Sequence, residues 1–348
     1  MILNELEIPV VLAPLAGAPS TPELTAAVSN AGGLGFLAAG YLPASDLRDR
    51  IARTRALTSA RFGVNVFVPG AGPTPPAEYE RFIESLTEWS RREGVELGEP
   101  RYSDDDWEAK IELLVRDPLS VVSFTFGCPD PELLAVLRAA GSETWVTVTS
   151  PAEAVQATEA GAQALVVQGA EAGGHRGSFA DRAELPGYSL LPLLGLVRDA
   201  VPVPLVASGA IATGAAVAAV LAAGASAAQL GTAFMLAPEA GTSPAHRAAL
   251  RSAQPTVLTR AFSGRLARGI RNGFIDAHGA EAPVAYPEIH YVTSPMRRRA
   301  REHGNADLIN LWAGEAHQLA DERPAGEIVA RLAADAAAAI RTAQTRLT

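Results

Sequence analysis

Two glycine-containing segments in the second half of the chain have residue types that suit a phosphate group. They contain Ser208, Gly209 and Ala210 in one segment, and Gln229, Leu230, Gly231 and Thr232 in the other. Converging backbone N–H groups hold a phosphate, glycine permits its close approach, and a helix N-terminus adds a favourable dipole. Each segment alone could be a tight turn, but together they favour a phosphate site and therefore a phosphorylated cofactor.

A third glycine-rich segment, residues 168–177, carries a candidate general base. It contains four glycines, among them Gly173 and Gly174, together with Gln168 and His175. Histidine is the side chain whose ordinary pKa suits proton transfer near neutrality, so His175 is the predicted base. An ordinary loop histidine is the alternative, which we disfavour because the segment follows a predicted strand on the face of the phosphate site. Glu171 and Arg176 are expected to support the loop or face solvent.

Small residues at the end of the first predicted strand, with one amide on the third, suit a flat ring system. The small residues are Ala13, Pro14 and Leu15. They leave room for a ring and present backbone groups to it, although a tight turn is an equal alternative. Asn65 is polar in an otherwise apolar strand, so it needs a hydrogen-bonding partner and can both donate and accept.

These residues need a scaffold, and eight short apolar runs predict one. The runs are residues 9–13, 34–38, 62–68, 121–126, 144–149, 164–168, 204–207 and 227–232. Most lack polar alternation, as strands buried on both faces of a parallel sheet do. Ala-Gly pairs ending at Gly32, Gly141, Gly161 and Gly224 mark helix ends, and Thr21 and Ser150 mark helix starts. This pattern favours an α/β fold of the (β/α)8 TIM barrel class over an open doubly wound sheet.

Two stretches exceed what a barrel needs. Residues 69–106 follow the third predicted strand, and residues 242–324 follow the eighth. Long connections after barrel strands lie at the face where ligands bind. We therefore expect a barrel of residues 1–240 with a closing helix at 325–348, and an insertion at 241–324, called the covering segment below, that covers the substrate.

Composition excludes several classes of protein. The 348 residues carry a net charge of −9, which argues against non-specific nucleic-acid binding, and 48% of them are hydrophobic, which predicts a folded chain. The single cysteine, Cys128, excludes an intrachain disulfide and a multi-cysteine metal site, and we expect it to pack or line a pocket. The chain shows neither a signal peptide nor a long apolar span, which predicts a cytoplasmic protein without membrane contact. The basic run from Arg297 to Arg301 is predicted to be a solvated helix face rather than an anion-steering patch.

The motifs together resemble the FMN-dependent nitronate monooxygenases, formerly called 2-nitropropane dioxygenases. The similar stretches are APLAG, GVNVF, VVSFTFG, VQGAEAGGHRG, ASGAIATG, QLGTAFM, SGRLARGIRNGF, YPEIHYVTSPMR and NLWAG. They are spread over nearly the whole chain. The resemblance implies an FMN over the carboxyl ends of the barrel strands and oxidation of a nitronate by O₂ to a carbonyl compound and nitrite.

The resemblance also implies roles for individual residues. Asn65, Gln168, Gly173 and residues 229–232 match FMN-binding positions, and His175 matches a histidine that deprotonates neutral nitroalkanes where these are accepted. Two positions depart from the family pattern. Ala210 replaces the second glycine of a Ser-Gly-Gly turn, where its N–H can still donate if φ is negative, and His290 replaces an expected asparagine.

Nitronate oxygens need positive or hydrogen-bonding partners, and the sequence offers several. Besides His175 these are Tyr286, His290 and Tyr291, and packing within a lid is an equal alternative for the tyrosines. Two other functions stay open: an FMN-dependent NAD(P)H reductase of the quinone or enoyl-ACP type, and a flavin- or phosphate-binding module without turnover. The physiological substrate, the oligomeric state and the choice between a one-electron and a peroxide-type path stay open as well.

Overall fold

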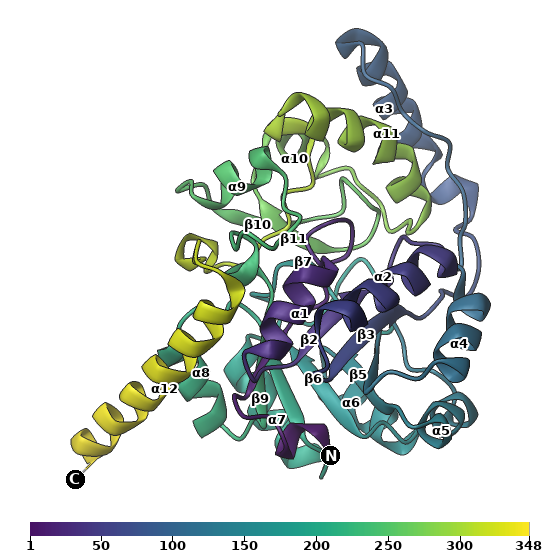
Figure 1. The fold of residues 1–348 in the computed structure, drawn as a ribbon. Coiled ribbons are helices and arrows are strands. Elements are labelled where there is room, and N and C mark those ends of the chain that lie inside the picture. Colours follow the sequence, from purple (N-terminus) through teal and green to yellow (C-terminus); the bar gives the residue numbers. More distant parts are fainter. Residues whose placement is uncertain (348) are drawn as a thin grey trace.

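The computed structural model describes residues 1–347, and its centre is a parallel β-barrel (Figure 1). The strands are β1 Val10–Leu12, β2 Gly35–Ala38, β3 Phe62–Phe67, β4 Val121–Thr125, β5 Glu143–Val148, β6 Ala164–Gln168, β8 Leu205–Ser208 and β9 Ala227–Leu230. They form an eight-stranded sheet in the order β1-β9-β8-β6-β5-β4-β3-β2. A parallel bridge between Val11 and Leu34 joins its two edges. The predicted TIM barrel is confirmed, and each predicted strand overlaps an observed one.

Helices surround the barrel. They are α1 Pro22–Asn30, α2 Ala44–Leu57, α4 Trp107–Arg116, α5 Pro131–Ala140, α6 Pro151–Glu159, α7 Leu190–Ala200, α8 Gly214–Ala222 and α12 Ala325–Leu347. The four glycines predicted to end helices all have positive φ, between +87° and +108°. The side chains of Thr21 and Ser150 accept hydrogen bonds from the first turns of α1 and α6, so both predicted caps are confirmed.

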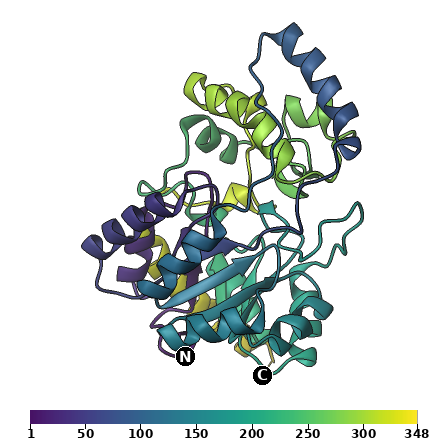
Figure 2. The same cartoon turned by 90° about the vertical axis from the view of Figure 1, so that its right-hand side faces the viewer.

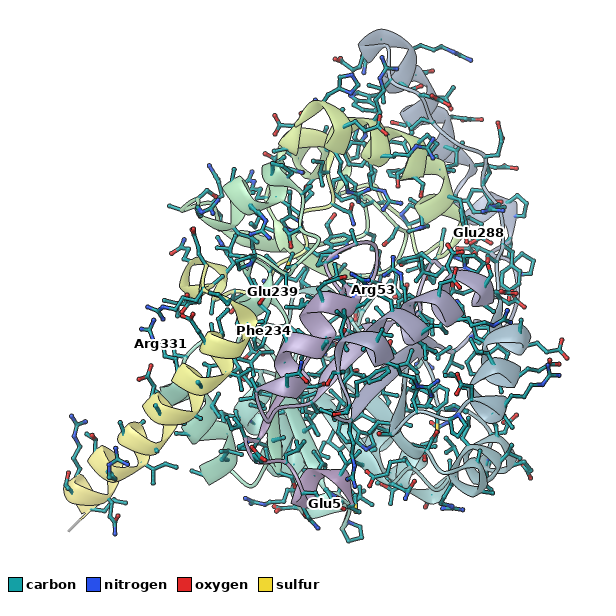
Figure 3. The ribbon with its side chains drawn as sticks, in the orientation of Figure 1. Glu5, Arg53, Phe234, Glu239, Glu288 and Arg331 are labelled. Atoms are coloured by element: carbon teal, nitrogen blue, oxygen red, sulfur yellow. The ribbon has the colours of Figure 1, made fainter. Side chains whose placement is uncertain are left out.

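Helix α12 packs against α8 and α1 and so forms the closing helix expected at 325–348, of which residue 348 lies outside the described residues. Its start is held by Glu239, labelled in Figure 3, whose carboxylate accepts a hydrogen bond from the N–H of Ala325 at 3.1 Å.

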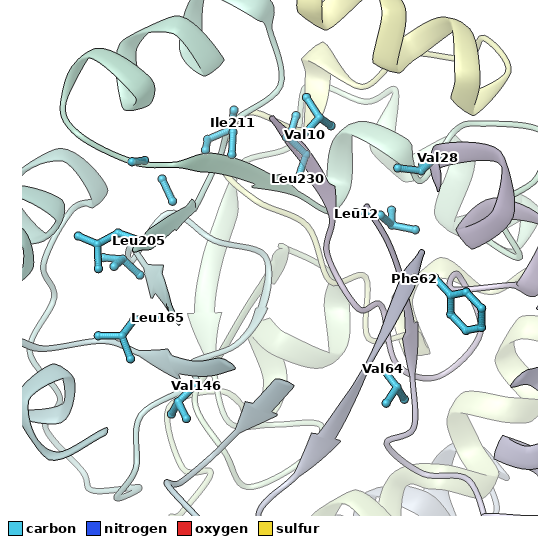
Figure 4. Packing of buried hydrophobic residues seen from close by; sticks show 14 of the residues in the cluster. Val10, Leu12, Val28, Phe62, Val64, Val146, Leu165, Leu205, Ile211 and Leu230 are labelled. Carbon is cyan, nitrogen blue, oxygen red and sulfur yellow. The ribbon is translucent and has the colours of Figure 1, made fainter. Parts of the chain in front are cut away.

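Side chains alternate along the strands between two apolar layers. Outward residues such as Val64, Val146 and Leu165 pack beneath the helices (Figure 4), whereas Phe36 and Trp145 fill the barrel interior. Nearer the carboxyl ends of the strands the inward positions become polar. These polar residues are Asn65, Ser123, Thr125, Thr147, Gln168, Ser208 and Gln229. The barrel is therefore closed by apolar packing at one end and lined by hydrogen-bonding groups at the other.

Most of the remaining elements lie beyond the carboxyl ends of the strands (Figures 1 and 2). They are η2 Pro76–Glu78, α3 Glu80–Glu93, α9 Pro244–Leu250, β10 Thr256–Thr259, β11 Ala267–Ile270, α10 Gly273–His278, α11 Glu288–His303, η4 Ala306–Leu308 and η5 His317–Leu319. Phe82 of α3 belongs to one apolar cluster with Phe274 of α10 and Ile289 of α11. Glu288 also accepts a hydrogen bond from the N–H of Thr74 at 2.8 Å. Residues 69–106 thus pack together with the covering segment.

A second, small sheet connects the barrel to the covering segment. Strand β7, Gly174–His175, lies in the connection after β6 and pairs antiparallel with β11, which in turn pairs with β10. His175 faces Ala267 in this register. The predicted base therefore stands in a β-ladder whose partner strand comes from a distant part of the chain.

Candidate functional site

A cavity of about 950 Å³ opens at the carboxyl ends of the barrel strands. It is lined by sixteen of the residues that the sequence analysis singled out: Ala13, Pro14, Leu15, Asn65, Gln168, Gly173, Gly174, His175, Ser208, Gly209, Ala210, Gln229, Gly231, Thr232, His290 and Tyr291. Two others lie elsewhere. Leu230 is buried in the apolar layer outside the strands, and Tyr286 is not part of the cavity lining but packs behind it, where its hydroxyl donates to Tyr41 at 3.3 Å.

The ends of β8 and β9 offer unpartnered backbone donors. In the described part of the chain, the N–H groups of Gly209, Ala210 and Gly231 donate to no protein acceptor. Residues 209 and 210 both have positive φ, +147° and +48°. The condition set for Ala210, a negative φ, is therefore not met, because the chain takes two such residues in succession as it leaves β8; its N–H nevertheless has no acceptor in the described chain. A non-glycine residue in this conformation costs about 1–2 kcal/mol.

Gly231 packs closely against the segment that follows β1. A Cβ atom at this position would lie 3.0 Å from Cδ2 of Leu15 and 3.3 Å from Cβ of Ala13. The hydroxyl of Thr232 accepts a hydrogen bond from the N–H of Gly314 at 3.0 Å, so the covering segment contacts this end of the barrel.

Asn65 presents an acceptor to the cavity. Its Nδ2 donates to Oγ of Ser123 at 2.9 Å and to Oγ1 of Thr125 at 3.0 Å. Both amide hydrogens are thus used within the barrel, and the partner that the sequence analysis required is found on the neighbouring strand. The Oδ1 atom has no protein donor among residues 1–347, so the amide can accept but not donate toward a ligand.

Gln168 shapes the loop that carries the base. Its Nε2 donates to the carbonyl of His175 at 3.0 Å, and its Oε1 accepts from the N–H of Gly177 at 2.8 Å. Arg176 is buried and donates to the carbonyl of Gly169 at 2.6 Å, so it supports the loop as expected. Glu171 does the same by accepting from the N–H of Leu190 at 3.0 Å.

Gly173 lets the covering segment close over this loop. A Cβ atom there would lie 2.5 Å from the backbone of Ala313 and Gly314, closer than real Cβ atoms approach backbone. The glycine is thus explained by a contact between two chain segments.

His175 is held in place by residues of the covering segment. Its Nε2 lies 2.8 Å from Oγ of Ser263, and its ring makes an edge contact with Trp312 at 5.4 Å between centroids. Burial, followed by the charges of Arg265 and Arg297, lowers the pKa of His175 to about 3. The imidazole is therefore neutral at pH 7, and its Nδ1 has no protein partner in the described chain.

Sequence reasoning assigned no role to Ser263, Arg265 or Trp312. All three lie in stretches that carried the family resemblance, which was the available signal. The guanidinium of Arg265 lies 3.9 Å from the centroid of the Phe126 ring and donates to the carbonyls of Arg176 and Ser178. Arg265 thus fixes the backbone on either side of Gly177 and adds positive charge behind the predicted base.

The wall contributed by α11 contains a second set of polar groups. The His290 ring stacks on Tyr41 with centroids 4.0 Å apart, and burial lowers the pKa of His290 well below its usual value. Arg297 is 5% exposed, so the prediction of a solvated basic face is wrong for this residue. The helical repeat places residues 290, 294 and 297 on one face toward the cavity, while Arg299 is exposed outside the cavity lining.

Cys128 takes no part in this chemistry. It is half-buried against the apolar layer, as predicted, and burial raises its pKa to about 11, so the thiolate is not populated at neutral pH. Within residues 1–347 no cluster of His, Cys, Asp or Glu side chains is suited to a metal ion. None of the helices there is long and apolar enough to cross a membrane.

Known proteins resemble this chain along nearly its full length. The family described as nitronate monooxygenase matches residues 2–335. A probable nitronate monooxygenase of Staphylococcus aureus (strain Newman) is 37% identical over 338 residues, which cover 94% of each chain. The structure of nitroalkane oxidase from Streptomyces ansochromogenes superposes with a TM-score of 0.95 at 48% identity and 99% coverage of both chains. FabK from Thermotoga maritima superposes with a TM-score of 0.78 at 26% identity, covering 99% of this chain and 97% of its own.

Proposed function

Because the chain belongs to the nitronate monooxygenase family, whose flavoenzymes oxidise nitronates, we propose that FMN binds in its cavity. The enzyme then uses O₂ as the second substrate, and His175 is the base that deprotonates neutral nitroalkanes. The observation that carries this proposal is the set of unpartnered N–H groups at the ends of β8 and β9, in one cavity with a neutral histidine.

The cavity residues fit FMN. Gly209, Ala210 and Gly231 offer N–H groups to a single terminal phosphate, and Oδ1 of Asn65 offers an acceptor to a ring N–H. The first strand is not followed by the glycine fingerprint of a dinucleotide fold, which favours FMN over FAD. When bound, FMN supplies the electron acceptor for the substrate and passes the electrons to O₂.

The protein's own contribution is to position the substrate and to move one proton. Oγ of Ser263 donates to the carbonyl of Arg265, so it accepts from Nε2 of His175. The other nitrogen of the neutral ring can then accept the α-proton of a nitroalkane. A nitronate has already lost that proton and needs only to be positioned. The covering segment, together with α3, is proposed to shield this step from water.

The test is the identity of the bound flavin and of the products. The purified protein should release FMN on heat denaturation, and it should form nitrite from alkyl nitronates under air. Chromatography of the released flavin and nitrite assay decide both points. FAD, or the absence of flavin, would refute the cofactor assignment, and nitrite formation no faster than with free FMN would refute the activity.

An NAD(P)H-dependent reductase is the weaker alternative, because the similarity to FabK is lower than that to the nitroalkane oxidase. Anaerobic mixing with NADH or NADPH separates the two, since rapid bleaching of the flavin would indicate a reductase. We also propose that residues 1–240 form the barrel and residues 241–324 the covering segment, and that the protein is cytoplasmic.

A further inference from the structure

Arg297 is a buried cation without a carboxylate partner. Its side chain is 5% exposed, and no carboxylate of residues 1–347 lies within 4.0 Å of it. Two buried cations have carboxylate partners: Lys110 lies 2.8 Å from Asp105, and Arg260 lies 2.7 Å from Asp181. Two others, Arg176 and Arg265, donate to backbone carbonyls instead. Burying an unpaired charge is unfavourable, so an unpaired arginine that lines a cavity and keeps an unused donor points to an anion that arrives from outside.

The guanidinium of Arg297 is held in a defined orientation. Its Nε donates to Oγ1 of Thr293 at 3.0 Å, and its Nη2 donates to the carbonyl of His290 and to Oγ of Ser294, both at 2.7 Å. No protein acceptor in the described residues lies within hydrogen-bond distance of Nη1, although the residue lines the cavity. The donors of Nη1 are therefore available to a ligand.

His290 adds a second donor. Its Nδ1 lies 3.3 Å from Nη2 of Arg297, whose two hydrogens already donate to the carbonyl of His290 and to Oγ of Ser294. Because an arginine nitrogen cannot accept, an unprotonated Nδ1 is the arrangement that keeps two N–H groups from facing each other. The neutral ring then carries its proton on Nε2, which has no protein partner in the part of the chain described. The stack on Tyr41 fixes the plane of the ring. The hydroxyl of Tyr41 accepts from Tyr286, which leaves its own hydrogen free to donate.

The surrounding charges favour an anion as well. Arg101, Arg298 and Arg301 line the same cavity as Arg297. The acidic residues in its lining are already engaged, since Asp105 pairs with Lys110, and Asp106 accepts from the N–H of Ala44 at 2.7 Å.

We propose that Arg297 and His290 form an anion site that binds a planar, two-oxygen group of the substrate. A planar guanidinium edge matches such a group better than it matches a spherical ion. Two groups have this chemistry: the nitronate itself, and a carboxylate at the far end of a nitronate substrate. That the ligand is the substrate rests on the function proposed above, whereas the anion site itself does not.

The first test measures binding without turnover. Nitrate is planar and unreactive, and its affinity for the purified holoenzyme is measured by titration calorimetry. Arg297→Met should weaken nitrate binding about 10- to 100-fold, as expected for loss of a charged hydrogen-bonding partner, and Arg297→Lys should restore part of it. Arg299→Met is the matched control, because this exposed arginine is on the same helix outside the cavity lining, and it should leave the affinity within twofold.

A second variant keeps the proposal testable if Arg297→Met does not fold. His290→Phe retains an aromatic ring against Tyr41 but removes the Nε2 donor, so nitrate binding should weaken several-fold. Circular dichroism and flavin content establish that each variant is folded. Wild-type nitrate affinity in folded Arg297→Met or His290→Phe protein would overturn the proposal.

The second test identifies which substrate group is bound. The ratio kcat/KM is compared for ethylnitronate and for a nitronate bearing a terminal carboxylate. A loss in Arg297→Met on both substrates assigns the site to the nitronate oxygens, and a loss confined to the second substrate assigns it to the carboxylate. Unchanged values on both would overturn the site as a substrate site. Arginine-dependent nitrate binding in a protein that forms no nitrite would instead refute the proposed function and leave the anion site standing.

Discussion

Replacing His175 with asparagine separates the possible roles of the imidazole. The variant keeps the backbone pairing with Ala267 in β11, so the fold should survive, although the shorter amide does not reach Ser263 as Nε2 does. The ring contacts with Phe126 and Trp312 are lost, which affects packing around residue 175 rather than at the ends of β8 and β9. The variant therefore removes a proton acceptor while leaving the residues proposed to bind FMN in place.

The expected size of the effect depends on the protonation state of the substrate. Burial lowers the pKa of His175 to about 3, so at pH 7 the ring is a neutral base and contributes no positive charge. Its loss should lower kcat/KM for nitroethane about 10²- to 10⁴-fold, which corresponds to about 3–5 kcal/mol. Ethylnitronate has no proton to lose, so its kcat/KM should change only a few-fold.

The assay is kcat/KM on both substrates for wild type and variant, with flavin content matched. Ser263→Ala is the control that keeps the imidazole but removes its hydrogen bond, and it should lower nitroethane turnover about 10-fold by loosening the ring. Equal losses of 10²–10³ on both substrates would show that His175 stabilises nitronate oxygens instead. No change on either substrate would refute its place in the mechanism.

Three further outcomes are expected. Because burial lowers the pKa of His175 to about 3, the imidazole stays unprotonated as the pH falls from 7.5 to 5. The pH–rate profile of kcat/KM for nitroethane should therefore show no inflection near pH 6.5, and an inflection there would contradict the lowered pKa. Ala210→Gly should raise the free energy of unfolding by about 1 kcal/mol, because φ is +48° there, and chemical denaturation showing no gain would count against the strain. Gly231→Val should lower the amount of flavin bound per protein while leaving the melting temperature nearly unchanged, because the added side chain displaces Leu15 and Ala13 at the cavity wall. An undiminished flavin content in the folded variant would show that the phosphate site lies elsewhere.

The barrel could be predicted from the sequence because its strands and helix ends depend on local patterns. A strand buried on both faces must be apolar at successive positions, as Leu165, Val166 and Val167 are. A helix that ends in the left-handed conformation favours glycine, as at Gly141 and Gly224. Each of these signals extends over a few residues, and neighbours in sequence suffice to produce it.

The surroundings of the base required the tertiary structure, because the residues that determine them are far apart in the chain. Ser263 contacts His175 although the two residues are 88 positions apart in the chain, because β7 pairs with β11. The residue types of Gly174 and His175 do not predict that pairing. The prediction that Arg297 faces solvent was wrong for a similar reason. A run of charged residues in a helix predicts an exposed face, and only the tertiary structure shows that a cavity lies against the face of α11 that carries Arg297. The conformation of Ala210 likewise depends on how the chain leaves β8. The sequence by itself therefore determined the scaffold and its chemical groups, and only the long-range contacts decided which groups are neutral, charged or free to meet a ligand.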